Sequence, residues 1–293
     1  MKITVTDRSS GLLCMLWASF LFSLMAACVY CARIADPTVQ TSVVSFVRVL
    51  ENLLMLVVGA MWGGGIKALF GDLSVSLWMR GIFGCLSMML YFFSIQMLGT
   101  GESSFLFSSK GIFIVLMAPL ILSESFSWKS LIAIFGSILG LYFLFNPHLQ
   151  EGNWDGPTIA LLGGFFAALS NVMVAKAGKR NSPECVVFYF CFVSVLIHLS
   201  FFYVFPASLP GENLWLWLAM VGAGITAGTG QIYLTKAYQR APAPVVTAVG
   251  YSEPVYNLGW SILFFGDLMT GRALIGCLLV LFFGILLPFL RNK

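Results

Sequence analysis

Four ionisable side chains lie inside long apolar stretches of this sequence: Arg48, Glu51, Lys110 and Glu253. A charge placed in hydrocarbon costs at least about 2.5–3.5 kcal/mol on insertion scales, so such a group normally faces a polar cavity or a charged partner. The expected chemistry is the recognition of a charged solute, because an intramembrane charge is by default part of a functional site.

Lys110 and Glu253 fall on each other when the chain is aligned with itself at an offset of 143 residues. An inverted two-fold axis between the two halves would place this cation and this anion at matching depths on opposite walls of a cavity. We therefore predict that they bind a solute carrying both charge signs. The alternative is a permanent ion pair that only locks the helix bundle. Arg48 and Glu51, three residues apart on one helix, are also close enough to pair with each other.

Other polar and aromatic side chains are expected at the same depth as these charges and complete the predicted solute site. Lys110 itself is expected about eight residues, or roughly 12 Å, inside its helix. Pro254, directly after Glu253, removes a backbone donor and frees carbonyl groups in mid-helix, and carriers place their sites at such broken helices. The additional site residues are Trp17, Tyr91, Gln96, Asn171, Gln231, Tyr251, Tyr256 and Asn257.

Three residues are candidates for proton coupling: Glu253, Glu51 and His198. A buried carboxyl group can titrate near neutrality, which suits either glutamate to this role. A lone histidine in a helix is more often a packed, hydrogen-bonded group than a proton relay.

The elements that must position these residues are membrane-spanning helices. Of the 293 residues, 59% are hydrophobic and 10% are charged, whereas a soluble domain is nearer a quarter charged. A helix needs about 20 apolar residues to cross a bilayer, and the first run is too long for a cleavable signal peptide. Apolar runs bounded by charged residues, Gly, Pro or Asn predict ten helices, at 11–31, 38–60, 76–98, 102–122, 128–146, 156–175, 184–205, 213–235, 244–266 and 271–290.

The second half of the chain repeats the first. An offset of 146 residues, for example, aligns Pro37 with Pro183. Each repeat holds five helices, an odd number, so the second copy must be inserted upside down relative to the first. We therefore predict an all-α polytopic membrane protein of ten transmembrane helices in two inverted five-helix repeats (5+5), one over residues 1–150 and the other over 151–293.

Basic residues gather on one side of the predicted bundle, which identifies that side as cytoplasmic. With the N-terminus inside, only Arg33 and Arg272 lie outside. The predicted location is the cell inner (plasma) membrane, crossed several times, with both termini in the cytoplasm. Twelve basic residues are expected on the cytoplasmic side, namely Lys2, Arg8, Lys67, Arg80, Lys129, Lys176, Lys179, Arg180, Lys236, Arg240, Arg291 and Lys293.

Four short motifs accompany the ten-helix repeat pattern: Phe46-Val47-Arg48, Tyr91-Phe92-Phe93-Ser94-Ile95-Gln96, Ala118-Pro119 followed by Glu124, and Glu253-Pro254-Val255 followed by Gly266-Asp267. With these motifs, the chain resembles the drug/metabolite transporter superfamily, specifically its EamA-type members, over essentially its whole length. The resemblance implies a central cavity lined by helices 1–4 and 6–9, alternating access, and substrates that range over amino acids, nucleotide-linked metabolites and organic cations. Lys110 and Glu51 belong to no general pattern of this family, so their roles rest on their positions alone.

The predicted function is secondary transport, as export or import, of a small polar metabolite that is zwitterionic or charged, such as an amino acid or S-adenosylmethionine. An exporter of quaternary-ammonium cations or drugs is the alternative within this class, with Trp17, Tyr91, Tyr251 and Tyr256 as an aromatic cage. A membrane receptor or scaffold without transport activity is the alternative from another class. The expected partners are the solute and the lipid bilayer, without nucleic acid, and the protein is expected to be a monomer or a homodimer.

No enzyme, cofactor or metal site is predicted. Cys28-x-x-Cys31 lacks the second cysteine pair of a zinc site, and the glycines between 222 and 230 lie in an apolar helix without the preceding strand of a phosphate-binding loop. The spacing by four of Gly224 and Gly228, and of Gly136 and Gly140, instead favours close packing of helices.

Overall fold

The computed structural model describes residues 5–63, 65–147, 154–207, 211, 213–265 and 270–286, and all the regular elements in them are helical. The predicted all-helical architecture is therefore confirmed, and the helices follow the ten predicted segments. They are α1 (Val5–Ala35), α2 (Thr41–Gly63), α3 (Val75–Leu98), α4 (Thr100–Phe107), α5 (Lys110–Leu122), α6 (Trp128–Phe145), α7 (Asp155–Ala177), α8 (Pro183–Val204), α9 (Leu214–Arg240), α10 (Ala243–Gly250), α11 (Glu253–Phe265) and α12 (Gly271–Val280), with a 3-10 turn η1 (Ile66–Leu69) and a π-helical continuation of α12, η2 (Leu281–Leu286).

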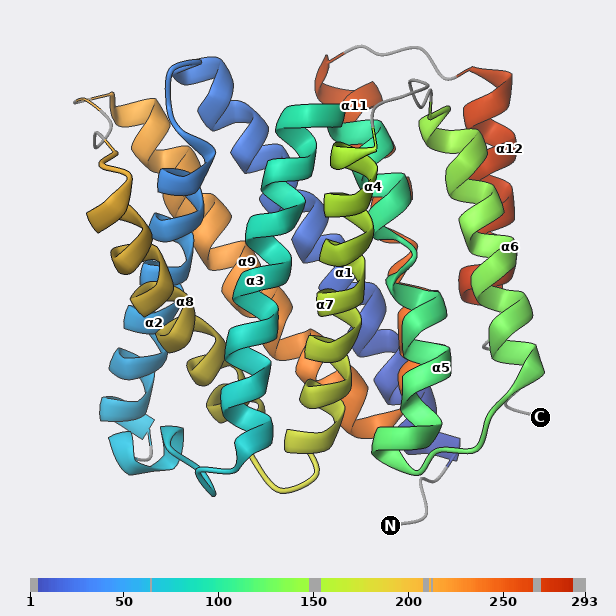
Figure 1. Cartoon of the computed structure of the whole chain (residues 1–293), viewed down its shortest axis with the longest axis horizontal. Coiled ribbons are helices and arrows are strands. Elements are labelled where there is room, and N and C mark those ends of the chain that lie inside the picture. Colours follow the sequence, from blue (N-terminus) through green and yellow to red (C-terminus); the bar gives the residue numbers. More distant parts are fainter. Residues whose placement is uncertain are drawn as a thin grey trace.

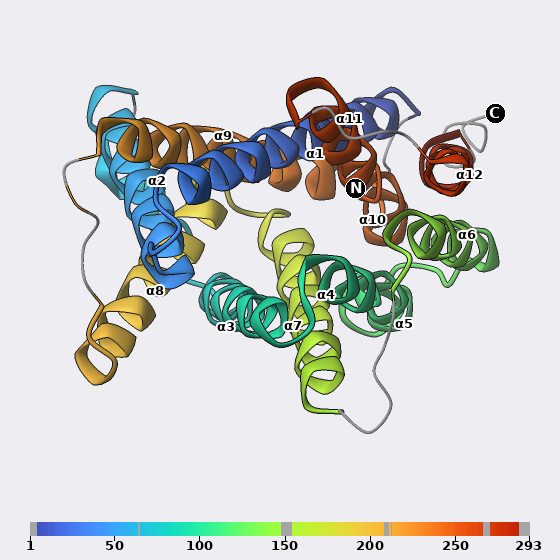
Figure 2. The same ribbon diagram turned by 90° about the horizontal axis from the view of Figure 1, so that it is seen from above.

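Neighbouring segments run antiparallel across the molecule (Figure 1). Seen from above, α9 and α1 form one row, and α3, α7, α4 and α5 form a second row that faces it (Figure 2). The pair α2–α8 lies at one end of the two rows and the pair α6–α12 at the other.

The packing is symmetrical between the two halves of the chain. If α1 to α6 correspond in order to α7 to α12, the contact of α1 with α9 is matched by that of α7 with α3, and both are extensive. The contact of α5 with α7 is matched by that of α11 with α1, while α2–α8 and α6–α12 are each their own counterpart. A two-fold axis between repeated halves produces this exchange of contacts.

Seven candidate membrane spans are found among the described residues, fewer than the ten predicted segments. They correspond to α1, α2, α3, the α4–α5 pair, α6, α7 and α8. The remaining segments are α9, which is diluted by glycine and threonine, the interrupted pair α10–α11, and α12, which is short as an α-helix.

The fourth and ninth segments are broken at equivalent places. An interruption of the ninth helix beside Glu253 was predicted from Pro254, whereas the prediction of one unbroken helix over 102–122 is wrong. The helix pair α4–α5 covers 100–107 and 110–122, and α10–α11 covers 243–250 and 253–265, so every bound moves by 143 residues. At the first break, the Ser108 hydroxyl donates to the carbonyl of Ser104 at 2.7 Å, a side-chain bond that competes with the helical ladder. At the second, Pro254 has no N–H with which to continue the helix.

Two glycines bring the peripheral helices α6 and α12 into backbone contact. A Cβ atom on Gly140 would lie 2.8 Å from the carbonyl oxygen of Gly276, and a Cβ on Gly276 would lie 2.7 Å from that of Gly140. Since both obstructing atoms belong to the backbone, no side-chain rotation relieves the overlap.

We expect Gly140→Ala to destabilise the protein by about 1–3 kcal/mol, the usual effect of overpacking a tight contact. Gly59→Ala is the matched control, because a Cβ there meets nothing within 4 Å and alanine favours the helix over glycine. Thermal unfolding in detergent measures both variants, and a Gly140→Ala protein that melts at or above the wild-type temperature would contradict the expectation.

Candidate functional site

A cavity of about 840 Å³ lies between the two halves of the chain, and we call it the central cavity. Among the described residues, its lining comes from α1 to α5 and α7 to α11, with only Phe145 from α6. This agrees with the lining by helices 1–4 and 6–9 that the family resemblance implies. The charged residues of the described lining are Arg48, Arg80, Lys110 and Glu253.

Lys110 and Glu253 are the first residues of α5 and α11, the half-helices that follow the two breaks. Lys110 is thus at a helix start and not eight residues inside a helix, as the sequence predicted, and Pro254 lies in the first turn of α11 instead of mid-helix. Helix N-termini carry unpaired N–H groups and the positive end of the helix dipole. Both broken segments therefore present the positive N-terminus of a half-helix at the cavity. At the start of α11, the first residue is the acidic Glu253.

The Lys110 ammonium group has an aromatic neighbour and an acidic one. Its nitrogen lies 5.0 Å from the centre of the Phe107 ring, and it interacts electrostatically with Glu253. Within the part of the chain that the structure describes, no direct ion pair joins Lys110 to Glu253. The two charges are therefore available to a solute in this conformation.

Arg80 was expected on the cytoplasmic face, and that expectation is wrong. The side chain is only 4% exposed and lines the central cavity from α3. Its guanidinium donates to the Ser170 hydroxyl and, at 2.8 Å, to the Gln231 side chain, and it lies 4.4 Å from the centre of the Phe190 ring. Its position inside the predicted span 76–98 was the signal that could have identified it, since a residue near a helix end can still point into the bundle.

Arg48 lines the same cavity from α2, but it does not pair with Glu51. Its two terminal nitrogens approach the sulfur atoms of Met25 and Met88 at 2.9 and 2.6 Å. The Glu51 carboxylate lies instead where α2 crosses α9, against Gly224, and its Oε2 atom has no hydrogen-bond partner. Asn52 lies one step further along this crossing, against Gly228. The small residues of α9 thus accommodate polar side chains of α2.

The other predicted site residues divide into three groups. Tyr91, Asn171, Gln231, Tyr251 and Asn257 line the central cavity. Gln96 and His198 line a second cavity, described below. Trp17, which is 57% exposed, and Tyr256 are absent from the described lining of either cavity. Polar or aromatic lining residues that the sequence did not single out as site residues include Asn52, Ser104, Ser108, Ser170, Tyr238, Thr247 and Trp260.

The hydroxyl groups of Tyr91 and Tyr251, which line the central cavity, form hydrogen bonds within the protein. Tyr251 donates to the carbonyl of Ser108 across the first helix break, and Tyr91 bonds the Ser104 hydroxyl at 2.7 Å. Tyr251, at the second break, thereby ties the two broken segments together and holds the chain directly before Lys110.

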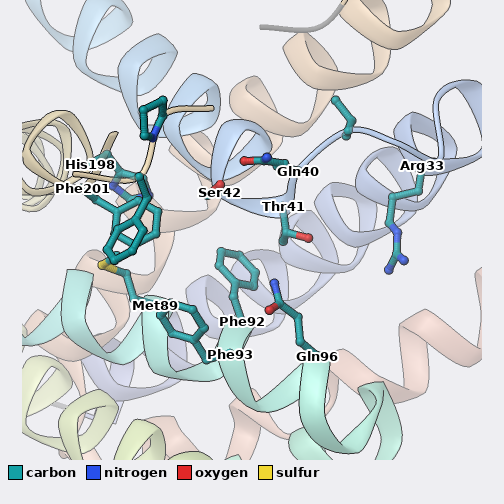
Figure 3. Close-up of a pocket in the computed structure, with 13 residues that line it drawn as sticks. Arg33, Gln40, Thr41, Ser42, Met89, Phe92, Phe93, Gln96, His198 and Phe201 are labelled. Carbon is teal, nitrogen blue, oxygen red and sulfur yellow. The ribbon is translucent and has the colours of Figure 1, made fainter. Parts of the chain in front are cut away.

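A second cavity of about 590 Å³ lies beside the first, and we call it the peripheral cavity (Figure 3). Phe92, Phe93 and Gln96 of α3 face the start of α2 there, with His198 of α8 nearby. Phe92 also lines the central cavity, so the two cavities adjoin at this ring. His198 is 2% exposed and bonds the Ser194 carbonyl at 2.8 Å, which is the packed arrangement of a structural histidine.

Hydrogen bonds join the two halves at the face of the molecule where α1 begins, which we call the N-terminal face. The Asn181 side chain donates to the Asp72 carboxylate and accepts from the Asp72 backbone N–H, both at 2.9 Å. The Tyr189 hydroxyl also joins the two halves, by donating to the Phe70 carbonyl at 3.0 Å. Within the second half, Gln239 donates to the Asn181 carbonyl at 3.0 Å. Hydrogen bonds from Asn181 and Ser74 lower the pKa of Asp72, which keeps it a charged acceptor.

Glu124, between α5 and α6, also forms a hydrogen bond between the two halves at the N-terminal face. One of its carboxylate oxygens accepts from the backbone N–H of Ala243, at the start of α10, at 3.2 Å. Burial raises the pKa of Glu124, while the bond from Ala243 and the charge of Lys179 oppose the rise. The folded protein therefore holds a proton on Glu124 more tightly than the unfolded chain does.

This raised pKa predicts a pH-dependent contribution to stability. The contribution is fully present below the ordinary pKa of 4.5 and is lost as the pH rises through the raised value. In that window we expect the melting temperature of the wild type to fall relative to that of Glu124→Gln, which cannot titrate. Parallel curves of melting temperature against pH for the two proteins would refute the expectation.

Known proteins match this chain along nearly its whole length. A model of the EamA-like transporter family matches residues 9–146 and 155–289. The chain is 27% identical to Pseudopaline exporter CntI of Pseudomonas aeruginosa, over 92% of this chain and 93% of that protein. It is 24% identical to the Riboflavin transporter of Vibrio cholerae, over 58% and 59%. A crystal structure of another protein, 17% identical, shares the fold with a TM-score of 0.81 over 94% and 96% of the two chains.

The two family matches fall one on each structural half, so they describe the same repeat that the packing shows. With its central cavity and its multi-pass helical fold, the chain belongs to the EamA-like transporter family and is a secondary transporter of a small metabolite, not an enzyme.

Proposed function

We propose that this transporter carries an amphoteric metabolite, which presents an amine to Glu253 and an acidic group to Lys110. One observation carries the proposal: the two residues begin equivalent half-helices at paired breaks, face one cavity and form no ion pair in the described part of the chain. An amino acid head group complements such a cation and anion and relieves the unfavourable burial of both.

The volume of the central cavity accommodates a solute of amino-acid size or larger. Pockets of about 300–1,000 Å³ hold ligands up to the size of drugs, and the central cavity measures about 840 Å³. The relative from Pseudomonas aeruginosa is named as an exporter, which favours export as the direction of transport.

The hydrogen bonds at the N-terminal face are proposed to keep the central cavity closed on that side in one state of the transport cycle. Described basic residues of that face, such as Lys179 and Arg180 beside Asn181, favour its assignment to the cytoplasm of a cell with this protein in its inner membrane. Alternating access then requires the Asn181–Asp72 and Tyr189–Phe70 bonds between the two halves to break when the cavity opens to the cytoplasm.

A quaternary-ammonium solute is the weaker candidate. Only Tyr91 and Tyr251 of the four aromatic side chains expected to form a cage line the central cavity in the described structure, and both hydroxyls are bonded within the protein. Three cations in the same lining also oppose a solute whose net charge is positive, which disfavours S-adenosylmethionine as well.

Coupling to protons is proposed for Glu51 or Glu253, since Glu51 has an unpartnered carboxylate oxygen and Glu253 has no direct ion pair among the described residues. Solute movement into proteoliposomes is then expected to change when the pH gradient is collapsed. Flux that is the same with and without the gradient would exclude this coupling.

Solute flux and thermal stability test the proposed solute class. Purified protein is heated with L-amino acids, with choline as the quaternary amine and with nucleotides, since a ligand that binds only the folded state raises the melting temperature. We expect amphoteric compounds to stabilise the protein and to exchange across proteoliposomes. Stabilisation and flux with choline alone would overturn the proposal in favour of a cation exporter, and binding without flux would favour a receptor.

A further inference from the structure

Two guanidinium groups of the central cavity have no acidic partner among the residues that the structure describes. Arg48 and Arg80 lie toward α8, where both interact with Cys191. Lys110 and Glu253 begin α5 and α11, which lie nearer the opposite end of the two helix rows (Figure 2). Building on the function proposed above, we infer that the solute carries a second acidic group, a carboxylate or a phosphate, and that Arg48 and Arg80 bind it.

In the described part of the chain, the hydrogen-bond acceptors of Arg48 are weak ones. Its two terminal nitrogens contact the thioether sulfurs of Met25 and Met88, and a thioether is a weak acceptor compared with a carboxylate or phosphate oxygen. A guanidinium group offers a planar fork of donors that matches the two oxygens of such a group. Arg48 is therefore held in place within the cavity with its strongest bonding capacity unused.

Arg80 has stronger hydrogen-bond acceptors than Arg48, but not all of its donors are used. Ser170 and Gln231 accept from its terminal nitrogens, and both acceptors are neutral. Its Nε atom is buried without a hydrogen-bond partner, and the whole residue is only 4% exposed. A buried polar atom without a partner is unfavourable, and an acidic group in the cavity would remove that penalty.

The charge balance of the cavity points the same way. Its described lining contains the cations Arg48, Arg80 and Lys110 and a single carboxylate, Glu253. An amino acid head group neutralises Lys110 and Glu253 but leaves both arginines uncompensated. A solute with one further acidic group, at the end of the molecule remote from its amine, lowers this excess of two positive charges to one if the group is a carboxylate, and nearly removes it if the group is a phosphate. Such a solute also uses more of the cavity volume.

Two matched pairs of probes test the inference: L-glutamine with L-glutamate, and L-serine with O-phospho-L-serine. The members of each pair share the head group and differ chiefly by one acidic group. A hydrogen bond to a charged group contributes about 1.5–3 kcal/mol, so the wild type is expected to bind the acidic member of at least one pair about ten- to hundred-fold more tightly. A preference in the first pair assigns a carboxylate solute, and a preference in the second a phosphate.

Arg48→Gln is expected to abolish this preference while keeping the affinity for the neutral member. Arg80→Lys, which keeps the charge but loses the planar fork, is expected to weaken the preference in the same way. Arg240→Gln is the control, because Arg240 bonds Ser10 at the N-terminal face and is absent from the described lining. Isothermal titration with detergent-purified protein measures each affinity.

Two results would overturn the inference, and they differ from a failure of the proposed function. If the wild type binds both members of each pair equally, or if Arg48→Gln weakens both members equally, the arginines do not recognise a second acidic group. If none of the four probes binds, the amphoteric head-group site at Lys110 and Glu253 fails, and the inference fails with it.

Discussion

Lys110→Met is expected to reduce solute transport about ten- to hundred-fold without unfolding the protein. The reduction follows from the loss of a charge-assisted hydrogen bond to the acidic group of the solute, which contributes about 1.5–3 kcal/mol. Stability is expected to be unchanged or higher, because an apolar side chain of similar length removes a buried charge that has no direct ion pair in the described structure. Glu253→Gln is expected to act similarly through the amine of the solute.

Initial rates of flux in proteoliposomes, normalised to folded protein, measure this effect. Lys129→Met and Glu184→Gln are matched controls, since neither residue belongs to the described lining of the central cavity. The double variant should lose little more than either single variant if both groups bind the same solute molecule. Full transport by both single variants would remove Lys110 and Glu253 from the site.

The equivalent positions of Lys110 and Glu253 in the two repeats could be predicted, because this equivalence depends only on residue type and on the repeat. Membrane insertion makes charges rare, so two charges at one offset of 143 residues stand out in an apolar sequence. The interruption beside Glu253 could be predicted from Pro254, but the break beside Lys110 could not, because no proline lies between Gly99 and Ala118. That break depends instead on the Ser108 side-chain hydrogen bond and on the tertiary contact between Tyr251 and the Ser108 carbonyl.

The sequence also could not predict which face of each helix points toward the cavity and which toward lipid. Trp17 and Arg80 both lie in apolar helices, yet Trp17 is 57% exposed and Arg80 is 4% exposed. In a membrane protein the outer surface is as apolar as the interior, so hydrophobic periodicity does not distinguish the face toward lipid from the face toward a cavity. Only the packing of α3 against α7 and α8 shows that Arg80 points inward.

Asn181→Asp is expected to open the N-terminal face and to shift the conformational equilibrium about ten- to hundred-fold toward the open state. The substitution replaces the amide that donates to Asp72 at 2.9 Å with a like charge, and loses a bond to a charged group of about 1.5–3 kcal/mol. Cys185 reports the change, because it is fully buried and lies beside Asn181. Its alkylation by a thiol reagent, followed by mass spectrometry of the Cys185 peptide, is expected to accelerate accordingly.

Adding Asp72→Asn to Asn181→Asp tests whether the bond itself closes this face. The double variant restores one amide and one carboxylate at the contact with their positions exchanged, so it should protect Cys185 again. Asn213→Asp is the control at the opposite face: it loses the bond to the Ala35 carbonyl but keeps a good N-cap for α9, so Cys185 should stay protected. If Asn181→Asp leaves Cys185 protected, or if the exchange does not restore protection, the Asn181–Asp72 bond does not hold the face closed. Rescue by the exchange would instead place a polar gate between the two repeats, at the end of the molecule where alternating access requires one.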